Sequence, residues 1–310
     1  MTAIDDKILT VLDSEYVQPS APVTAMCEKI MARHEGRVQA LVYYGSSLRA
    51  MNDTGKMLDF YVLVDSYRKT HKNPVRALLN AAIPPAVYYL ENENEDGSLS
   101  TCKYSILSLK AFQSRCNEKA LLSQVWGRFS QPCIVLFPVS DTVKTKVQMA
   151  RIAAIKHMAN VTRPLMNCPV SAAAFWARGF RESYRTELRP EKSGARSQEI
   201  VTRYQDRYDA ISDALFGPPK DGLYTLPDST KSQAAKCKRQ WWLRRFIGKP
   251  ATAIRVLNSA FTFDGGLDYV LHKLKNHSGE TIEVTESQRK HPILWSPVLG
   301  WKLYKKGAFR

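Results

Sequence analysis

The feature that most constrains this chain is a short apolar strand that ends at a small turn. Val38-Gln-Ala-Leu-Val-Tyr-Tyr44 is rich in β-branched and aromatic residues and is followed at once by Gly45-Ser46-Ser47. Because glycine tolerates backbone conformations that other residues avoid, we expect the chain to turn at Gly45. A second strand is expected over residues 57–64, and it carries Asp59. The sequence therefore predicts two strands joined through a glycine turn, with a carboxylate close by.

The rest of the first half predicts a mixed sheet with helices. Residues 5–35 favour a helix before the first strand, with Pro22 near a helix start and Gly36 as its stop. Further strands are expected over residues 86–90 and 103–107, and the turn-forming residues 95–98 separate them.

The second half is predicted to be mainly helical. Five segments favour helix between Pro- or Gly-bearing breaks, namely 144–161, 171–181, 197–215, 231–246 and 250–260. The length of 310 residues fits two domains at about 150 residues each. We therefore predict an α+β fold: a sheet domain over residues 1–140, then a helical domain over 141–310, for which a winged-helix-like arrangement is one form.

Composition narrows the class of protein. Hydrophobic residues at 44% and charged residues at 24% are the balance of an ordinary globular protein. The six cysteines form no CxxC pair or Cys/His cluster, so neither a zinc site nor a secreted disulfide framework is indicated. No apolar run approaches the ~20 residues that span a bilayer, and an acidic N-terminus argues against a secretory or transit leader. These features predict a location in the cytosol or a matrix.

The net charge of +16 favours polyanionic partners, whether nucleic acid, nucleotide or anionic lipid, without choosing among them. Motifs of several enzyme classes are missing from the sequence: it contains no GxxxxGK[ST], no GxGxxG after a strand, no GxSxG and no HExxH. Kinase-type, dinucleotide-binding and hydrolase functions therefore lack support.

The glycine turn and Asp59 together suit a nucleoside triphosphate. A turn of this kind lets the backbone approach phosphates, and a carboxylate on the next strand can hold their Mg²⁺. This is the arrangement of the nucleotidyltransferase fold, which usually has a second carboxylate at i+2, where this chain has Tyr61. Asp65 is expected to cap a turn, Glu91 is a further candidate ligand, and an ordinary turn and strand without a site remain an alternative.

Several blocks, read in order, resemble one family. They are Tyr44-Gly-Ser46, Leu58-Asp-Phe60, Val87-Tyr-Tyr89, Lys103-Tyr-Ser-Ile-Leu-Ser108 and Val125-Trp-Gly-Arg-Phe-Ser-Gln-Pro132, with Phe180-Arg-Glu-Ser-Tyr-Arg185, Phe246-Ile-Gly-Lys-Pro250 and Ala260-Phe-Thr-Phe263 downstream. Their order and spacing are similar to those of the Tam-type mitochondrial CDP-diacylglycerol synthases, the translocator assembly and maintenance protein family. The chain resembles a divergent, bacterial-type member, since Ser47 and Ser105 stand where the family has glycine and Gln131 stands where it has lysine.

This resemblance implies a membrane-peripheral phosphatidate cytidylyltransferase that uses CTP and Mg²⁺ to make CDP-diacylglycerol. It implies Asp59 and Lys103 as catalytic residues, with Asp59 as the metal ligand. The implied nucleotide-binding residues are Tyr44, Gly45, Ser46, Ser47 and Arg128, and the implied phosphatidate-binding residues are Arg185 and Lys249. Under this interpretation nucleic acid is not a partner, and the protein lies on the inner membrane face, which in a eukaryote would be the matrix side.

A basic aromatic segment offers a way to reach lipid. Residues 236–247 interleave five cations with Trp241, Trp242, Leu243 and Phe246, and residues 301–306 repeat the theme. Such a helix suits an anionic membrane surface. The alternative is a helix that packs Trp242 and Phe246 into the core and leaves its cations in solvent.

Two other functions stay open at this point. The same fold could transfer a nucleotidyl group to a nucleic-acid end or another phosphorylated molecule. Alternatively, the chain could be a non-catalytic module that binds nucleic acid through residues 236–245.

Overall fold

The computed structural model describes residues 2–50, 57–71, 73–94, 96–188 and 193–259, together with 285 and 287. The family block at 260–263 and the basic segment at 301–306 lie outside the described residues.

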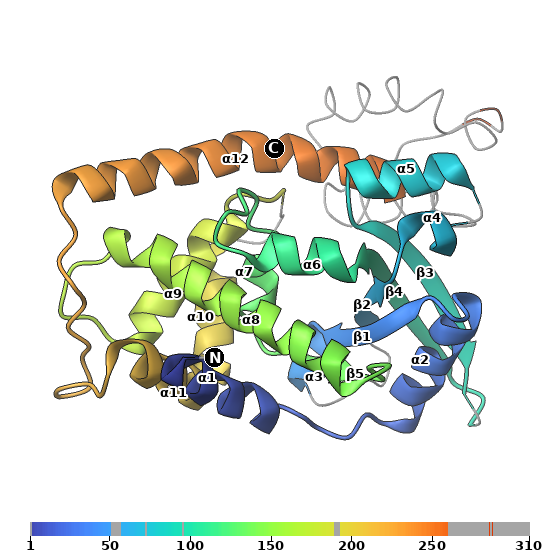
Figure 1. Ribbon diagram of the computed structural model, residues 1–310, viewed down its shortest axis with the longest axis horizontal. Helices are drawn as coiled ribbons and strands as arrows, with labels where there is room; N and C mark the ends of the chain where they lie inside the picture. Colours follow the sequence, from blue (N-terminus) through green and yellow to red (C-terminus); the bar gives the residue numbers. More distant parts are fainter. Residues whose placement is uncertain are drawn as a thin grey trace.

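A five-stranded mixed sheet forms the centre of the first half (Figure 1). Its strands are β1 (Val38–Tyr44), β2 (Leu58–Val64), β3 (Ala86–Glu93), β4 (Leu99–Ser108) and β5 (Ile134–Leu136), in the order β3-β4-β2-β1-β5. The pair β2 and β4 is parallel and the other neighbouring pairs are antiparallel. The four strands predicted from the sequence are therefore confirmed, whereas β5 was missed because three residues between prolines carry little strand signal.

The helices cover both faces of this sheet and form the second half. In chain order they are α1 (Ala3–Ser14), α2 (Ala21–Arg33), α3 (Ser46–Ala50), α4 (Tyr67–Thr70), α5 (Pro74–Ala82), α6 (Leu109–Cys116), α7 (Trp126–Phe129), α8 (Asp141–Thr162), the 3₁₀ turn η1 (Arg163–Leu165), α9 (Ala172–Tyr184), α10 (Ser193–Arg203), α11 (Gln205–Phe216) and α12 (Lys231–Ser259). The predicted α+β class, a mixed sheet with a helical part, is confirmed.

The two faces of the sheet belong to two hydrophobic clusters, because side chains alternate along each strand. On one face, residues such as Leu41 and Phe60 pack with Ile30 of α2. On the other face, Val42 and Tyr61 join a larger cluster that also contains residues of α8, α9, α11 and α12. This larger core continues across residue 140, and the domain boundary there stays a prediction.

Three of the predicted helix limits were wrong. The segment 5–35 is two helices, since Pro19 interrupts it and Pro22 occupies the first turn of α2. The segment 197–215 is divided at Tyr204 into α10 and α11. Conversely, the two helices predicted over 231–246 and 250–260 are continuous as far as residue 259, the last described residue of this segment. They form one helix, α12, which runs along one edge of the molecule (Figure 1) and contains Pro250.

Tertiary packing explains why α12 continues through Pro250. A proline inside a helix removes one backbone hydrogen bond and normally disfavours the helix. Gly248 packs against α9's end so closely that an added Cβ would lie 2.5 Å from the Thr186 carbonyl oxygen. After the proline, the Gln124 amide donates to the Thr252 hydroxyl at 3.0 Å. These contacts hold both halves of α12 against the same body.

Candidate functional site

The residues of the glycine turn open into a pocket of about 240 Å³ at the edge of the sheet where β1 ends and β2 begins. Its lining comes from β1, β2, β4, α7 and the helical half. The lining residues are Tyr44, Gly45, Ser46, Asp59, Lys103, Arg128, Gln131, Pro132, Tyr184, Arg196, Ile200 and Tyr204.

Gly45 makes the turn, as predicted, with a φ of +100°. An added Cβ would lie 2.9 Å from the Asp59 Cβ and would overlap its carboxylate oxygen. Two requirements, a left-handed backbone and close contact with Asp59, therefore select glycine at this position. Ser46 also lines the pocket, whereas Ser47 is buried and lines a separate hollow beside Leu48.

Asp59 and Lys103 face each other across the parallel strands β2 and β4, where they are direct partners in the register. The Lys103 ammonium lies 3.0 Å from Asp59 Oδ1. Asp59 is only 8% exposed, whereas the Lys103 side chain is 36% exposed. The pair thus presents an accessible cation beside a largely buried carboxylate at the floor of the pocket.

Arg128 supplies a second cation from α7. Its guanidinium lies over the Tyr44 ring, 5.0 Å from the centroid, and 4.0 Å from Glu187 Oε2. Burial lowers the pKa of Arg128, but Tyr44, Tyr61 and Glu187 outweigh it, and the net shift is upward. For the Tyr44 hydroxyl, burial has the opposite effect and raises the pKa well above its usual value. At neutral pH the pocket therefore holds a charged Arg128 beside a protonated Tyr44.

The position two residues after Asp59 serves packing. Tyr61 is buried, and its ring contacts Phe129 edge-on with centroids 4.9 Å apart. The other carboxylates considered from the sequence lie elsewhere: Asp65 accepts from the Ser66 backbone N–H at 2.6 Å and pairs with Arg37. The N-cap residue of α4 is Ser66, so Asp65 does not cap that helix. Glu91 accepts a 2.6 Å hydrogen bond from the Tyr89 hydroxyl.

Within the described residues, no group of three or more His, Cys, Asp or Glu side chains is arranged to hold a metal ion. Mg²⁺ commonly binds through one or two carboxylates together with substrate phosphates. Asp59 fits this arrangement as the single carboxylate, and a bound triphosphate would supply the other ligands. The described residues do not form a metal site from protein ligands alone.

The sequence did not predict that the helical half contributes to this pocket. Arg196 and Ile200 come from α10, and Tyr204 follows it. The Arg196 guanidinium donates to Glu199 at 2.6 Å on the same helix. No local pattern could place α10 over a turn some 150 residues earlier in the chain, although the family blocks did include Gln131, Pro132 and Tyr184.

The two predicted phosphatidate-binding cations do not line the pocket. Arg185 is exposed at the end of α9 and lies 3.4 Å from the buried Glu182, which also pairs with Arg178 and Arg245. Lys249 is exposed on α12, one helical turn after Arg245. The structure therefore places both on a basic surface where α9 meets α12.

The aromatic residues of α12 divide between core and surface. Trp241 is buried, and its indole N–H donates to the Val161 carbonyl at 3.0 Å. Trp242 and Phe246 are 57% and 65% exposed and stack on each other with centroids 5.4 Å apart. The expectation that these two enter the core is therefore wrong, because the helix turns Trp241 and Arg244 inward instead.

Comparisons with known proteins leave the family unassigned: no protein-family model and no curated protein matches this chain. The Tam-type resemblance stays a prediction. In the part of the chain that the structure describes, every helix is too short or too polar to cross a membrane.

Proposed function

We propose that the protein transfers CMP from CTP to phosphatidate, giving CDP-diacylglycerol and pyrophosphate, with Mg²⁺ as cofactor. One observation carries this proposal: a glycine turn packed directly on a single buried carboxylate, in a pocket that also exposes Lys103, Arg128 and Arg196. Among the described lining residues three cations accompany one carboxylate, and the partners Glu187 of Arg128 and Glu199 of Arg196 lie outside the lining. This excess of positive charge at the pocket favours a ligand with several negative charges, as a triphosphate has. The identity of the base and of the acceptor comes from the family resemblance.

The Asp59–Lys103 pair explains how such a ligand would be held. A nucleotide that arrives with its metal offers a partner to each member, because the carboxylate can bind the ion and the ammonium can bind a phosphate oxygen. Bound Mg²⁺ would neutralise charge on the phosphates. Arg128, fixed against the Tyr44 ring, and Arg196 from α10 would orient the triphosphate.

The transfer itself needs alignment more than acid–base chemistry. An oxygen of the phosphatidate phosphate forms a bond to the α-phosphorus, and the bond from that phosphorus to pyrophosphate breaks. Lys103 and Arg128, which both line the pocket, would stabilise the charge that develops on the departing oxygens.

The second substrate lies in a bilayer, so the proposal includes a peripheral position on an anionic membrane surface. Exposed Trp242 and Phe246 on α12 provide an apolar contact for such a surface. Arg185 and Arg245 both pair with Glu182 at the junction of α9 with α12, and they would provide cations for anionic headgroups.

The decisive experiment incubates the full chain with cytidine-labelled CTP, Mg²⁺ and phosphatidate-containing vesicles, and measures label in the lipid extract together with pyrophosphate. We expect Asp59→Asn to lower this transfer by at least about a hundredfold, since it removes the only carboxylate among the described residues that line the pocket. Asp65→Asn is the matched control: it neutralises a carboxylate next to the other end of β2 and should leave transfer unchanged.

Each other result points elsewhere. CTP binding without label in phosphatidate would redirect the search to another acceptor, such as an RNA end. Tight, salt-dependent oligonucleotide binding with no CTP binding would overturn the enzymatic proposal in favour of a basic binding module. Full activity of Asp59→Asn would remove Asp59 from the site.

A further inference from the structure

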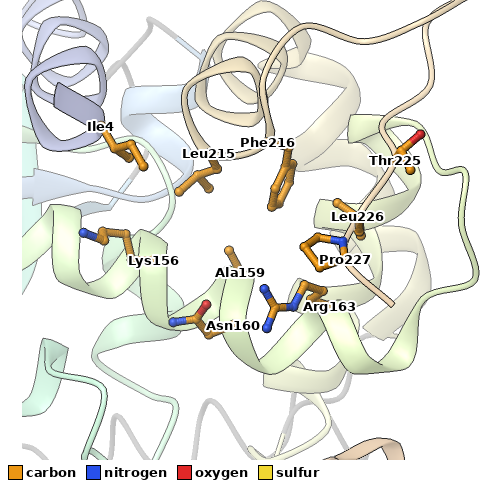
Figure 2. Close-up of a pocket in the computed structure, with 10 residues that line it drawn as sticks. All are labelled: Ile4, Lys156, Ala159, Asn160, Arg163, Leu215, Phe216, Thr225, Leu226 and Pro227. Atoms are coloured by element: carbon orange, nitrogen blue, oxygen red, sulfur yellow. The ribbon is translucent and has the colours of Figure 1, made fainter. Parts of the chain in front are cut away.

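A second pocket lies on the helical half, away from the glycine turn (Figure 2). Its volume is about 560 Å³, which falls within the range of about 300–1,000 Å³ typical of small-molecule sites. The lining residues are Ile4, Lys156, Ala159, Asn160, Arg163, Leu215, Phe216, Thr225, Leu226 and Pro227. Tyr204, which lines the first pocket, precedes α11, and Phe216 ends it. At about 1.5 Å per residue this helix separates the two pockets by roughly 18 Å.

One wall of this pocket is a polar row on α8 and its continuation into η1. Lys156, Asn160 and Arg163 are spaced by four and three residues, so they share a helix face, and the small Ala159 between them leaves space above the backbone. Figure 2 shows these side chains along one side of the hollow.

The facing wall is apolar. Leu215 and Phe216 come from the end of α11, and Leu226 with Pro227 comes from the segment before α12. In Figure 2 the Phe216 ring points across the hollow toward Ala159. A ligand here would contact hydrocarbon on one side and cations on the other.

The two cations differ in how far they are already neutralised. Lys156 lies 3.0 Å from Asp5 Oδ1, and this carboxylate also accepts from the Thr2 backbone, which is the main reason why its pKa falls to about 2. Arg163 forms no ion pair with any residue that the structure describes, and its Nε is buried without a hydrogen-bond partner. A half-buried guanidinium in this state, at the edge of an apolar hollow, favours an anionic ligand group.

We propose that this pocket binds a single-chain amphipathic anion, its hydrocarbon tail against Leu215, Phe216 and Leu226 and its anionic group on Arg163. A fatty carboxylate and a monoacyl or alkyl phosphate share this chemistry. This pocket is separate from the proposed transferase site, so the two proposals are tested independently of each other.

Isothermal titration calorimetry tests the proposal. Dodecanoate and, in a separate experiment, dodecyl phosphate are titrated into the whole chain, both below their critical micelle concentrations. Dodecanol and inorganic phosphate are the controls, because each lacks one half of the amphiphile. We expect one molecule bound per chain and at least about tenfold weaker binding of both controls. Tighter binding of dodecanoate would identify a carboxylate site, and tighter binding of dodecyl phosphate a phosphate site.

Two variants locate the binding. Arg163→Gln should weaken it at least about tenfold, whereas Arg181→Gln, the same change at an exposed position of α9, should have no effect. Thr225→Trp adds bulk at an exposed lining residue and should block the tail without disturbing the core. Circular dichroism checks that each variant is folded. Absence of saturable binding, equal affinity for dodecanol, or equal losses in the two arginine variants would overturn the proposal.

Discussion

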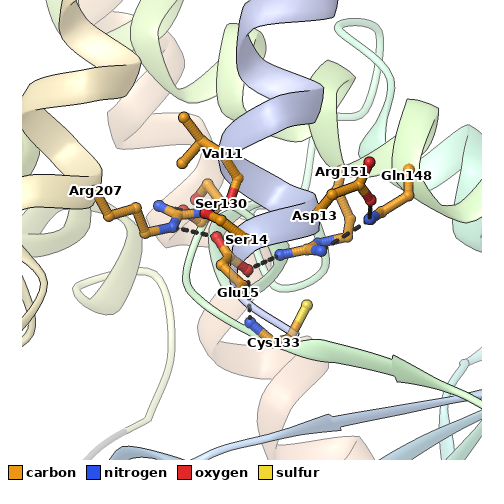
Figure 3. Close-up of polar contacts among 9 residues, drawn as sticks. All are labelled: Val11, Asp13, Ser14, Glu15, Ser130, Cys133, Gln148, Arg151 and Arg207. Carbon is orange, nitrogen blue, oxygen red and sulfur yellow. Dashed lines mark hydrogen bonds and ion pairs between the residues drawn. The ribbon is translucent and has the colours of Figure 1, made fainter. Parts of the chain in front are cut away.

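Two clusters of buried charge in this molecule use similar side chains for different ends. In the first, Glu15 at the end of α1 accepts from Arg151 of α8 and, at 2.5 Å, from Arg207 of α11 (Figure 3). Each arginine has another acceptor, because Arg151 donates to Gln148 at 2.8 Å and Arg207 to the Ser130 carbonyl at 3.1 Å.

The second cluster is Asp59 with Lys103 and Arg128 in the glycine-turn pocket.

The difference lies in what the cations can still bind. Around Glu15 the arginines are buried, bonded on several sides and in contact with no open volume among the pockets described, so the cluster joins α1, α8 and α11. In the glycine-turn pocket, Lys103 is partly exposed and Arg196 lines the same space. Paired opposite charges therefore occur both in the pocket and in a structural cluster, and what distinguishes the pocket is the open volume that its cations line.

Among the substitutions considered, we expect the largest loss of stability at Glu15. Glu15→Gln leaves two buried arginines without their shared counterion, so we expect the free energy of unfolding to fall by about 3–5 kcal/mol. Urea denaturation measures this change. Glu28→Gln, at an exposed position of α2, should change it by less than about 0.5 kcal/mol. A loss below about 1 kcal/mol at Glu15 would show that the cluster is not a structural element.

A second prediction separates backbone strain from site geometry at two glycines with positive φ. Gly45→Ala and Gly36→Ala should each cost about 1–3 kcal/mol of stability, because both force alanine into a left-handed conformation. Nothing lies within 4 Å of a Cβ at Gly36, whereas at Gly45 it would displace the Asp59 carboxylate. We therefore expect only Gly45→Ala to weaken Mg²⁺–CTP binding, by about tenfold, in equilibrium binding measurements. Equal binding by both variants would contradict the site.

A third prediction concerns a buried group that stays neutral. Burial beneath the sheet, with help from Arg33, lowers the pKa of His34 to about 4, and its ring nitrogen lies 3.0 Å from the Tyr104 hydroxyl. Below about pH 6.5 the unfolded chain binds a proton that folded His34 does not, so stability falls as the pH drops toward about 4. Denaturation at about pH 5 and pH 7 should show His34→Gln losing about 1–2 kcal/mol less than wild type over this interval. Parallel losses would exclude His34 as a source of acid sensitivity.

Sequence patterns predicted the part of the site made by neighbouring strands. The run 38–44 and the glycine after it placed β1 and its turn, and Asp59 was singled out because a carboxylate on the next strand can reach that turn. Lys103 and Arg128 came from the family resemblance, and both line the pocket. Arg185 and Lys249 came from the same source but lie on the α9–α12 surface, since short sequence blocks carry no information about which helix face packs inward.

By itself, the sequence determined the local features: β-branched runs that form strands, a glycine where the backbone needs positive φ, a proline in the first turn of α2, and the positive charge. Only the tertiary structure decided that α10 brings Arg196 to the glycine turn, that Trp241 enters the core while Trp242 does not, and that Glu15 rather than Asp59 holds helices together. The reason is physical. Strand and turn preferences act between neighbours in the chain, whereas burial and charge pairing depend on segments more than a hundred residues apart.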